Sequence, residues 1–406
     1  MSAKPSGEAA IIVFMRTVIT AERLWNGSHL VEHPVITVDD ENISSIAMGR
    51  SVVRGEGTRI LDFPGATLGP AFFDVHIHGA AGHDVMEATP KALDTASKFL
   101  ASCGTGSFLA TTVTAPLDTT FKSLSGLAKI IAREAVPGQA RPIGIHLEGP
   151  FLSHAKRGVQ PPAHLLPPDI RTFDRLFEAA EGTVRLMTLA AELPGAAELT
   201  AHATARGVRV SLGHSNATAA EALTAIKAGA VSATHTFNAM RALDHREPGI
   251  LGAVLTSDSL YAELICDGIH NAPEMVKLWW RAKGQERGIL VTDAMSAAGM
   301  PDGEYKLGGF AVQVKNGRAM ADGVLAGSVL TLDRALANFL RFTGATAEQG
   351  LRLLTTNPAA MTGFSERAES GHLGSVKLGQ RADLVAVDPA GKLIGSVIGG
   401  KTTPAP

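Results

Sequence analysis

The feature that most constrains the fold of this chain is a regular alternation of strand-like and helix-like segments. Eight short apolar segments recur: AFFDVHIHG, GTGSFLATTV, PIGIHLEG, TVRLMTLAAE, VRVSLGHS, AVSATHTFN, YAELICDGIH and GILVTDAM. Helix-like stretches such as PKALDTASKFLASCG, NATAAEALTAIKAGA and APEMVKLWWRAKG separate most of them. Near-continuous apolar strands that alternate with helices are typical of a parallel sheet covered on both faces. Eight such units over roughly 270 residues predict an α/β fold, a (β/α)8 TIM-like barrel, with a doubly wound open sheet as the alternative.

Short β-like segments at the two ends of the chain predict a second, smaller domain. They run from Ile11 to about Leu68 and return in GHLGSVKLGQRADLVAVDP, residues 371–389. We expect residues 11–68 and 370–400 to pair into a small β-sandwich domain, and residues 69–369 to form the barrel. Residues 1–10 are small and polar and are expected to be a disordered tail.

Composition excludes several classes of function. The 406 residues are 45% apolar and 19% charged, with a net charge of −2 and no basic run, so nothing predicts nucleic-acid binding. Cys103 and Cys266 give no disulfide framework and fit a reducing compartment. The apolar stretch at residues 9–15 is too short to span a membrane. We therefore expect a soluble, cytoplasmic protein without a membrane partner.

Metal-binding residue types lie where the predicted strands end. The first strand ends with His76 and His78, the third with Glu148, the fifth with His214, the sixth with His235 and the eighth with Asp293. In a barrel, the carboxyl ends of all strands meet at one mouth, so residues that are distant in sequence would come together there.

Each of these residues has an ordinary interpretation when it is taken singly. His76 and His78 point to the same side of a strand, about 7 Å apart, and most such pairs bind nothing. A lone histidine after a strand is usually structural, and Asp293 could cap a loop. Grouped at one mouth, however, imidazoles and a carboxylate are the ligands of zinc or another divalent ion. Such an ion would also neutralise Glu148, a carboxylate that is costly to bury unpaired.

The same segments, in the same order, resemble a known enzyme family. GPAFFDVHIHG, GIHLEGPFLS, SLGHSNAT, THTFNAMRAL, REPGI, DGIH, TDAMSAAG and GVLAGS are similar to motifs of the N-acetylglucosamine-6-phosphate deacetylases of the amidohydrolase superfamily. The resemblance runs from about residue 15 to 390. HLEGPF followed by GHSNAT and THTFNAM is the specific part, whereas the His-x-His pair and the aspartate mark only the superfamily.

The resemblance implies roles for individual residues. Glu148, His214 and His235 would bind the primary metal ion, and His76 and His78 would bind a second ion if two are present. Asp293 would be the catalytic carboxylate, and His270 would contact the acetamido carbonyl. The implied substrate-binding residues are Val159, Asn238, Ala239, Arg246, His270, Leu325, Ala326 and Gly327. The family also implies a homodimer in which Arg246 serves the neighbouring subunit.

The implied reaction is hydrolysis of N-acetyl-D-glucosamine 6-phosphate to D-glucosamine 6-phosphate and acetate, in amino-sugar catabolism or cell-wall recycling. The alternatives are the galactosamine isomer as substrate, another metal-dependent amidohydrolase, or a non-catalytic relative that binds a sugar phosphate. Zinc is the first choice of metal, and iron, manganese or cobalt would suit the same ligands. The chain departs from the family at Gln160, where a histidine is common, so we expect altered recognition of the phosphate or a hydroxyl in that loop.

Overall fold

The larger part of the chain is a barrel of parallel strands. The computed structural model describes residues 16–49, 57–366 and 372–404. The barrel strands are β6 (Phe72–Ile77), β9 (Thr105–Thr112), β10 (Arg141–Glu148), β11 (Val184–Leu189), β12 (Arg209–Leu212), β13 (Ala230–Ala233), β14 (Tyr261–Ile265) and β15 (Gly288–Val291). They pair in that order, and every pairing is parallel. Each strand coincides with one of the eight apolar segments of the sequence, and β10 alone begins one residue earlier, at Arg141.

Backbone hydrogen bonds join the first and the eighth strand where both end. The Asp293 amide donates to the His76 carbonyl at 2.9 Å, and the His78 amide donates to the Ala294 carbonyl at 2.8 Å. Ile77 and Ala294 also form a parallel bridge. Because the ring closes in this way, the predicted (β/α)8 barrel is confirmed and the open sheet is excluded.

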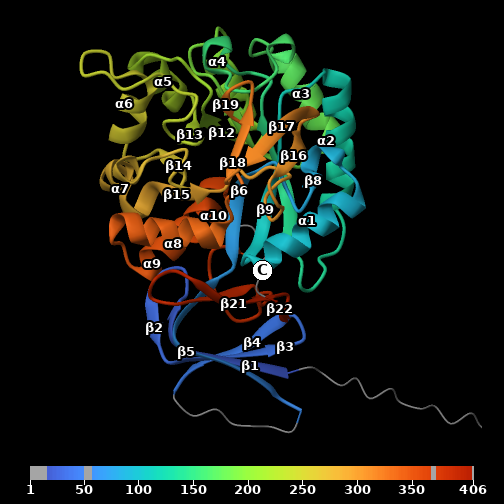
Figure 1. Cartoon of the computed structure of the whole chain (residues 1–406), viewed down its shortest axis with the longest axis vertical. Coiled ribbons are helices and arrows are strands. Elements are labelled where there is room, and N and C mark those ends of the chain that lie inside the picture. Colours follow the sequence, from blue (N-terminus) through green and yellow to red (C-terminus); the bar gives the residue numbers. More distant parts are fainter. Residues whose placement is uncertain (1–15, 50–56, 367–371, 405–406) are drawn as a thin grey trace, which may run out of the picture.

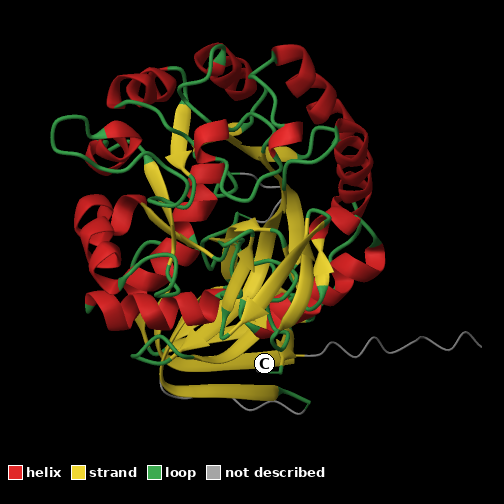
Figure 2. Cartoon of the chain, turned by 45° about the horizontal axis from the view of Figure 1, so that its top comes forward, coloured by secondary structure: helices red, strands yellow, loops and turns green. Residues whose placement is uncertain are grey.

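Helices surround the strands on the outside of the barrel (Figure 2). They are α1 (Pro90–Ser102), α2 (Leu117–Ile131), α3 (Ile170–Ala179), α4 (Ala196–Ala205), α5 (Ala219–Lys227), α6 (Gly249–Thr256), α7 (Pro273–Arg287), α8 (Leu332–Thr343), α9 (Ala347–Leu354) and α10 (Thr356–Thr362). In α1, the Thr89 side chain caps the helix, and Leu93, Ala96 and Leu100 form the buried stripe. None of the described helices is long and apolar enough to cross a membrane.

Strands from both ends of the chain form one mixed sheet below the barrel (Figure 1). Its strands are β1 (Arg16–Trp25), β2 (Leu30–Glu32), β3 (Pro34–Asp39), β4 (Asn42–Met48), β5 (Arg59–Pro70), β20 (Leu384–Val387), β21 (Leu393–Ile398) and β22 (Lys401–Thr403). The junction is the antiparallel pairing of β5 with β20. Apolar side chains from both ends of the chain, Ile36 and Leu384 among them, pack into a core separate from that of the barrel. The predicted tail, residues 1–10, lies outside the described residues, and the domain bounds stay a prediction.

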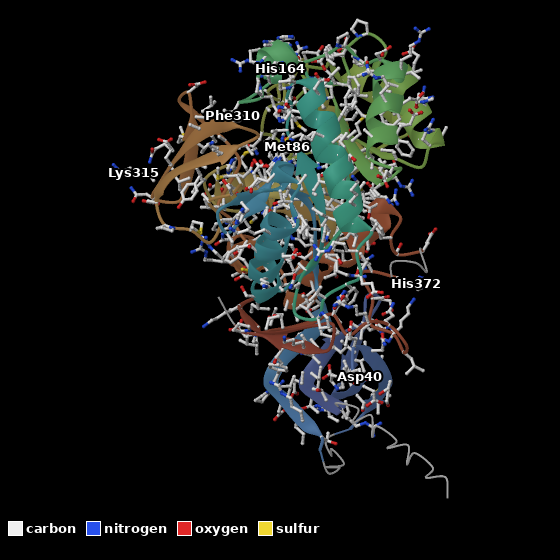
Figure 3. The ribbon with its side chains drawn as sticks, turned by 90° about the vertical axis from the view of Figure 1, so that its right-hand side faces the viewer. Asp40, Met86, His164, Phe310, Lys315 and His372 are labelled. Atoms are coloured by element: carbon white, nitrogen blue, oxygen red, sulfur yellow. The ribbon has the colours of Figure 1, made fainter. Side chains whose placement is uncertain are left out.

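A small antiparallel sheet after β15 was not among the predicted elements. Its strands are β16 (Gly303–Leu307), β17 (Phe310–Lys315), β18 (Arg318–Ala321) and β19 (Val324–Leu325). The sequence did carry a signal, because apolar and polar residues alternate in β17 and Asn316–Gly317 forms the following turn with positive φ at both residues. Figure 3 shows Phe310 and Lys315 of this sheet toward the same end of the molecule as His164, with Asp40 of the small domain at the other end.

Short elements complete the connections around the barrel mouth. They are β7 (Gly79–Ala80), β8 (His83–Asp84) and the 3-10 turns η1 (Val85–Glu87), η2 (His154–Lys156) and η3 (Pro162–His164). The segment from η2 to η3 follows β10 and passes over the strand ends, so it matters for the site described below.

The core that joins the two ends of the chain should contribute strongly to stability. Leu384 is 1% exposed in the core of the small domain, so Leu384→Ala should lower the free energy of unfolding by about 2–5 kcal/mol. Leu378→Ala is the matched control, because Leu378 is 68% exposed. Urea denaturation of both variants measures the difference, and equal losses would contradict the assignment of this core.

Candidate metal centre and cavity at the barrel mouth

Three side chains from separate strands converge on one point at the barrel mouth. Glu148 is the last residue of β10, while His214 and His235 follow β12 and β13. The Nε2 atoms of His214 and His235 lie 3.2 and 3.1 Å from Glu148 Oε1, and 3.1 Å from each other. All three side chains are buried.

These distances fit a metal site. Two imidazole nitrogens gain nothing by facing each other at 3.1 Å unless a proton or a cation lies between them. Ligand atoms of a tetrahedral zinc ion, with bonds of about 2.0–2.1 Å, lie about 3.3 Å apart. The chemistry of the donor set, one carboxylate and two imidazoles, also suits a divalent first-row ion. The residues present therefore fit the metal ion that the sequence implied.

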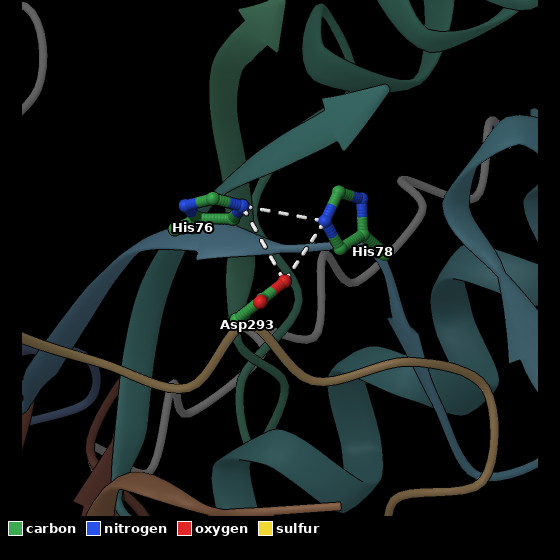
Figure 4. Close-up of side chains that lie close together, drawn as sticks. All are labelled: His76, His78 and Asp293. Atoms are coloured by element: carbon green, nitrogen blue, oxygen red, sulfur yellow. Dashed lines mark hydrogen bonds and ion pairs between the residues drawn. The ribbon is translucent and has the colours of Figure 1, made fainter. Parts of the chain in front are cut away.

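A second group of three donors lies beside the first. His76, His78 and Asp293 converge from the first and eighth strands, and their ligand atoms lie within 4.8 Å of one another (Figure 4). His78 Nε2 lies 3.0 Å from Asp293 Oδ1 and 3.3 Å from His76 Nε2. Glu148 lies between the two groups, because its oxygens are each 3.4 Å from Nε2 of His76 or His78. The structure thus brings all six predicted residues together.

Charge attraction within this cluster governs the ionisation of its acids. Burial by itself would raise the pKa of Glu148, but the neighbouring His76 and His214 lower it well below its usual range. Burial would likewise raise the pKa of Asp293, and the charge of His76 with the hydrogen bond from His78 lowers it. Both carboxylates are therefore ionised at neutral pH despite their burial.

Hydrogen bonds on the outer ring nitrogens orient the histidines. His214 Nδ1 donates to the Lys156 carbonyl at 2.9 Å, and His78 Nδ1 donates to the Thr111 carbonyl at 3.0 Å. His76 Nδ1 lies 3.2 Å from Oε2 of Glu263, a fully buried residue of β14. A proton held on Nδ1 leaves the Nε2 lone pair free to bind a cation. Glu263 is a contributor that the sequence did not reveal.

The backbone turns sharply at the residues that carry these side chains. His214, His235 and Asp293 have φ values of 45°, 29° and 49°, a conformation that non-glycine residues adopt at a cost. Gly149, directly after Glu148, has φ 105°, and a Cβ there would lie 2.2 Å from Thr114 Oγ1. Glycine is therefore required where β10 delivers Glu148 to the mouth.

A cavity of about 490 Å³ opens above the cluster. Val159, Asn238, Ala239, His270, Leu325 and Gly327, all predicted substrate contacts, line it together with Asp293. His270 Nδ1 is 2.7 Å from Asp267 Oδ2. Burial disfavours the charged imidazole, but the hydrogen bond and charge of Asp267 outweigh it and raise the pKa of His270. The pair therefore favours an imidazolium whose Nε2 is left to act as a donor.

Two predicted substrate residues lie elsewhere. Ala326 is fully buried in the core of the β16–β19 sheet and does not line the cavity. Arg246 is exposed in the loop between β13 and α6 and does not line it either. Lys156 and Arg318 are the lysine and arginine side chains among the described residues that line this cavity. Neither is among the substrate-binding residues predicted from the sequence, and Arg318 lies in the unpredicted sheet.

Gln160, for which the sequence predicted altered recognition of the phosphate or a hydroxyl, makes a contact that the sequence did not predict. Its side chain is buried and donates to Glu148 Oε2 at 2.9 Å, and the residue is also part of the cavity lining. Recognition of the sugar by Gln160 therefore stays a prediction. The sequence around Gln160 does not predict the hydrogen bond to Glu148, because Glu148 belongs to a different element, strand β10.

Sequence comparisons show the family to which this chain belongs. Residues 67–403 match the model of the amidohydrolase family. The chain is 42% identical over 322 residues to N-acetylgalactosamine-6-phosphate deacetylase of Escherichia coli O157:H7, covering 79% of this chain and 83% of that protein. It is 36% identical over 363 residues to N-acetylglucosamine-6-phosphate deacetylase of Bacillus subtilis (strain 168), covering 89% of this chain and 90% of that protein.

Solved structures agree over nearly the whole chain. N-acetyl-D-glucosamine-6-phosphate deacetylase from Mycobacterium smegmatis, a variant in complex with N-acetyl-D-glucosamine-6-phosphate, has a TM-score of 0.87 at 31% identity, covering 96% of this chain and 99% of that chain. The N-acetylglucosamine-6-phosphate deacetylase from Thermotoga maritima has a TM-score of 0.81 at 32% identity, covering 94% of this chain and 98% of that chain.

The metal-free cluster should lose stability as the pH rises. Burial lowers the pKa of His78, but hydrogen bonds to Asp293 and Glu148 outweigh burial and raise it from 6.5 to about 9. Because the folded pKa is the higher one, this stabilisation is fully present below about pH 6.5 and is lost as the pH rises through about 9. Urea titrations of the chelator-treated protein across that interval should show a falling free energy of unfolding.

His78→Asn is the control for this pH dependence. It removes one of the titrating groups, so the variant should be less stable at pH 6.5 and should vary less with pH. Stability that stays level or increases between pH 6.5 and 9.5 in the metal-free wild type would contradict the charge arrangement described above.

Proposed function

Because this chain belongs to the amidohydrolase family and, within it, to the N-acetylhexosamine-6-phosphate deacetylases, we propose that it hydrolyses N-acetyl-D-glucosamine 6-phosphate. The products would be D-glucosamine 6-phosphate and acetate, in amino-sugar catabolism or cell-wall recycling in the cytoplasm. The observation that carries the proposal is the convergence of Glu148, His214 and His235 beside Asp293, beneath a cavity that His270 lines.

The family depends on metal ions, and the donor sets of this chain accommodate them. We infer that Glu148, His214 and His235 hold the primary ion, with zinc the first choice and iron, manganese or cobalt the others. His76, His78 and Asp293 would hold a second ion if two bind. When bound, such an ion lowers the pKa of a water molecule and polarises an amide carbonyl.

Asp293 is suited to move the proton in the reaction. Its carboxylate is buried and ionised, and it faces the cavity beside the primary cluster. In that position it would accept a proton from the attacking water and deliver it to the nitrogen of the departing amine. General acid–base help of this kind contributes roughly 100- to 10,000-fold to a rate.

His270 is suited to stabilise negative charge on the acetamido oxygen. Asp267 accepts hydrogen bonds from His270 Nδ1 and from the backbone amides of Ile269 and His270, so the ring is firmly oriented. An imidazolium Nε2–H aimed into the cavity would donate to the carbonyl oxygen as its charge grows. A donor already in place costs no reorganisation at that moment.

The phosphate end of the substrate needs cations. Lys156 and Arg318 line the cavity from this chain, whereas Arg246 is exposed and away from it. We propose a homodimer in which Arg246 reaches the phosphate bound by the neighbouring subunit, where its planar guanidinium could make two parallel hydrogen bonds. Asn238 and Ala239 would position the sugar between the phosphate and the metal.

A second candidate substrate is the galactosamine isomer. It differs from the glucosamine compound in the configuration at one hydroxyl, and the 42% identical E. coli relative bears the name of that activity. Both sugars would present the same acetamido and phosphate groups to the residues described above. The two substrates must therefore be compared directly.

Acetate release decides between these substrates. Metal-loaded protein incubated with N-acetylglucosamine 6-phosphate should release acetate with a higher kcat/KM than with N-acetylgalactosamine 6-phosphate, and chelator-treated protein should release little. A reversed preference would establish the second candidate. No turnover of either sugar by a folded, metal-loaded sample would reject the proposed function.

Replacing the proposed proton carrier separates binding from chemistry. Asp293→Asn should lower kcat by about 100- to 10,000-fold, because an amide cannot accept the proton. KM and binding of the primary metal ion should change little, and steady-state kinetics with metal analysis measures all three. Near-normal kcat in this variant would refute the role of Asp293.

A further inference from the structure

Gln160 connects two elements of the barrel mouth through its side-chain amide. Its Oε1 accepts from the Thr114 backbone amide at 2.8 Å, and its Nε2 donates to Glu148 Oε2 at 2.9 Å. The partners dictate this orientation, since a backbone N–H can only donate and an ionised carboxylate can only accept. The residue is 3% exposed, so water does not readily replace either bond.

The two carboxylate oxygens of Glu148 have different neighbours, and the hydrogen bond from Gln160 involves only one of them. Oε1 lies 3.2 and 3.1 Å from Nε2 of His214 and His235, at the centre of the primary cluster. Oε2 accepts the hydrogen bond from Gln160 at 2.9 Å, while His78 Nε2 is more distant from this oxygen, at 3.4 Å. Without that donor the carboxylate could rotate about its terminal torsion, whose energy profile is broad. Gln160 therefore keeps one oxygen turned toward the two imidazoles.

The same segment orients a second member of the cluster. The Lys156 carbonyl, four residues before Gln160, accepts from His214 Nδ1 at 2.9 Å. Residues 156–160 thus support two of the three donors from outside. The Lys156 contact uses a backbone atom and survives side-chain substitution, whereas the Gln160 contact can be removed by mutation.

We propose that Gln160 is a positioning residue that sets the affinity of the Glu148–His214–His235 site for its metal ion. The inference rests on the metal site of the proposed function, and it assigns Gln160 to metal binding rather than to recognition of the sugar. Partners of metal ligands in other proteins typically change metal affinity by about 10- to 100-fold when they are mutated. The same range is expected here.

Two variants test the proposal, one by removing the polar groups of the side chain and the other by shortening it. Gln160→Met keeps the length of the side chain and removes both polar groups, whereas Gln160→Asn keeps the amide but is one methylene too short to reach both partners. Each protein is stripped with a chelator and titrated with Zn²⁺ against a competing indicator. Both should bind Zn²⁺ about 10- to 100-fold more weakly than the wild type. The visible spectrum of bound Co²⁺ should also change, since it reports ligand geometry.

The matched control is His154→Ala. His154 lies on the same segment with an exposed side chain, so this variant should bind Zn²⁺ as the wild type does. Circular dichroism of each metal-free variant checks that it is folded. If one Gln160 variant fails to fold, the other carries the test.

Substrate kinetics separate the two roles of Gln160. At saturating metal, KM for the phosphosugar should stay within about twofold of the wild-type value if Gln160 acts through Glu148. Unchanged Zn²⁺ affinity in a folded variant would overturn the proposal, and a raised KM alongside it would return Gln160 to substrate recognition. The Zn²⁺ titration needs no turnover, so it stands even if the wild type hydrolyses neither sugar.

Discussion

A negative charge buried at the barrel mouth is the constraint on which the site depends. Glu148 is 3% exposed, and a carboxylate at such depth is unstable unless its environment neutralises it. The neighbouring imidazoles supply that environment in the absence of a metal ion, and an ion would supply it when bound. The strand ends around Glu148 accordingly carry donors of matching type, at the cost of left-handed backbone at three of them.

Rigidity of the donors comes from residues that do not themselves face a metal ion. The Lys156 and Thr111 carbonyls, Glu263 and Gln160 each hold one donor from outside the cluster. Asp267 holds His270, which lines the cavity, in the same way. These partners leave the donors little freedom to reorient, so the geometry that binds an ion is present before the ion arrives.

The sequence predicted those elements of the fold that depend on interactions between residues close together in the chain. The eight barrel strands were predictable because each is a run of apolar residues bounded by local turn signals. The β16–β19 sheet escaped prediction although its Asn316–Gly317 turn is a local signal, because it interrupts the repeating strand–helix pattern. It supplies part of the cavity wall, including Arg318, so the missed element also concealed a cavity residue.

By itself, the amino-acid order determined the strand–helix repeat, the family, and the residue types at the end of each strand. These are properties of short segments, which local pattern and chemistry can specify. Only the tertiary structure decided which atoms meet: that Gln160 holds Glu148 Oε2, that Ala326 turns into a core, and that Arg246 lies away from the cavity of its own chain. Those outcomes depend on barrel closure and on side-chain packing between segments distant in sequence, and no single segment encodes either.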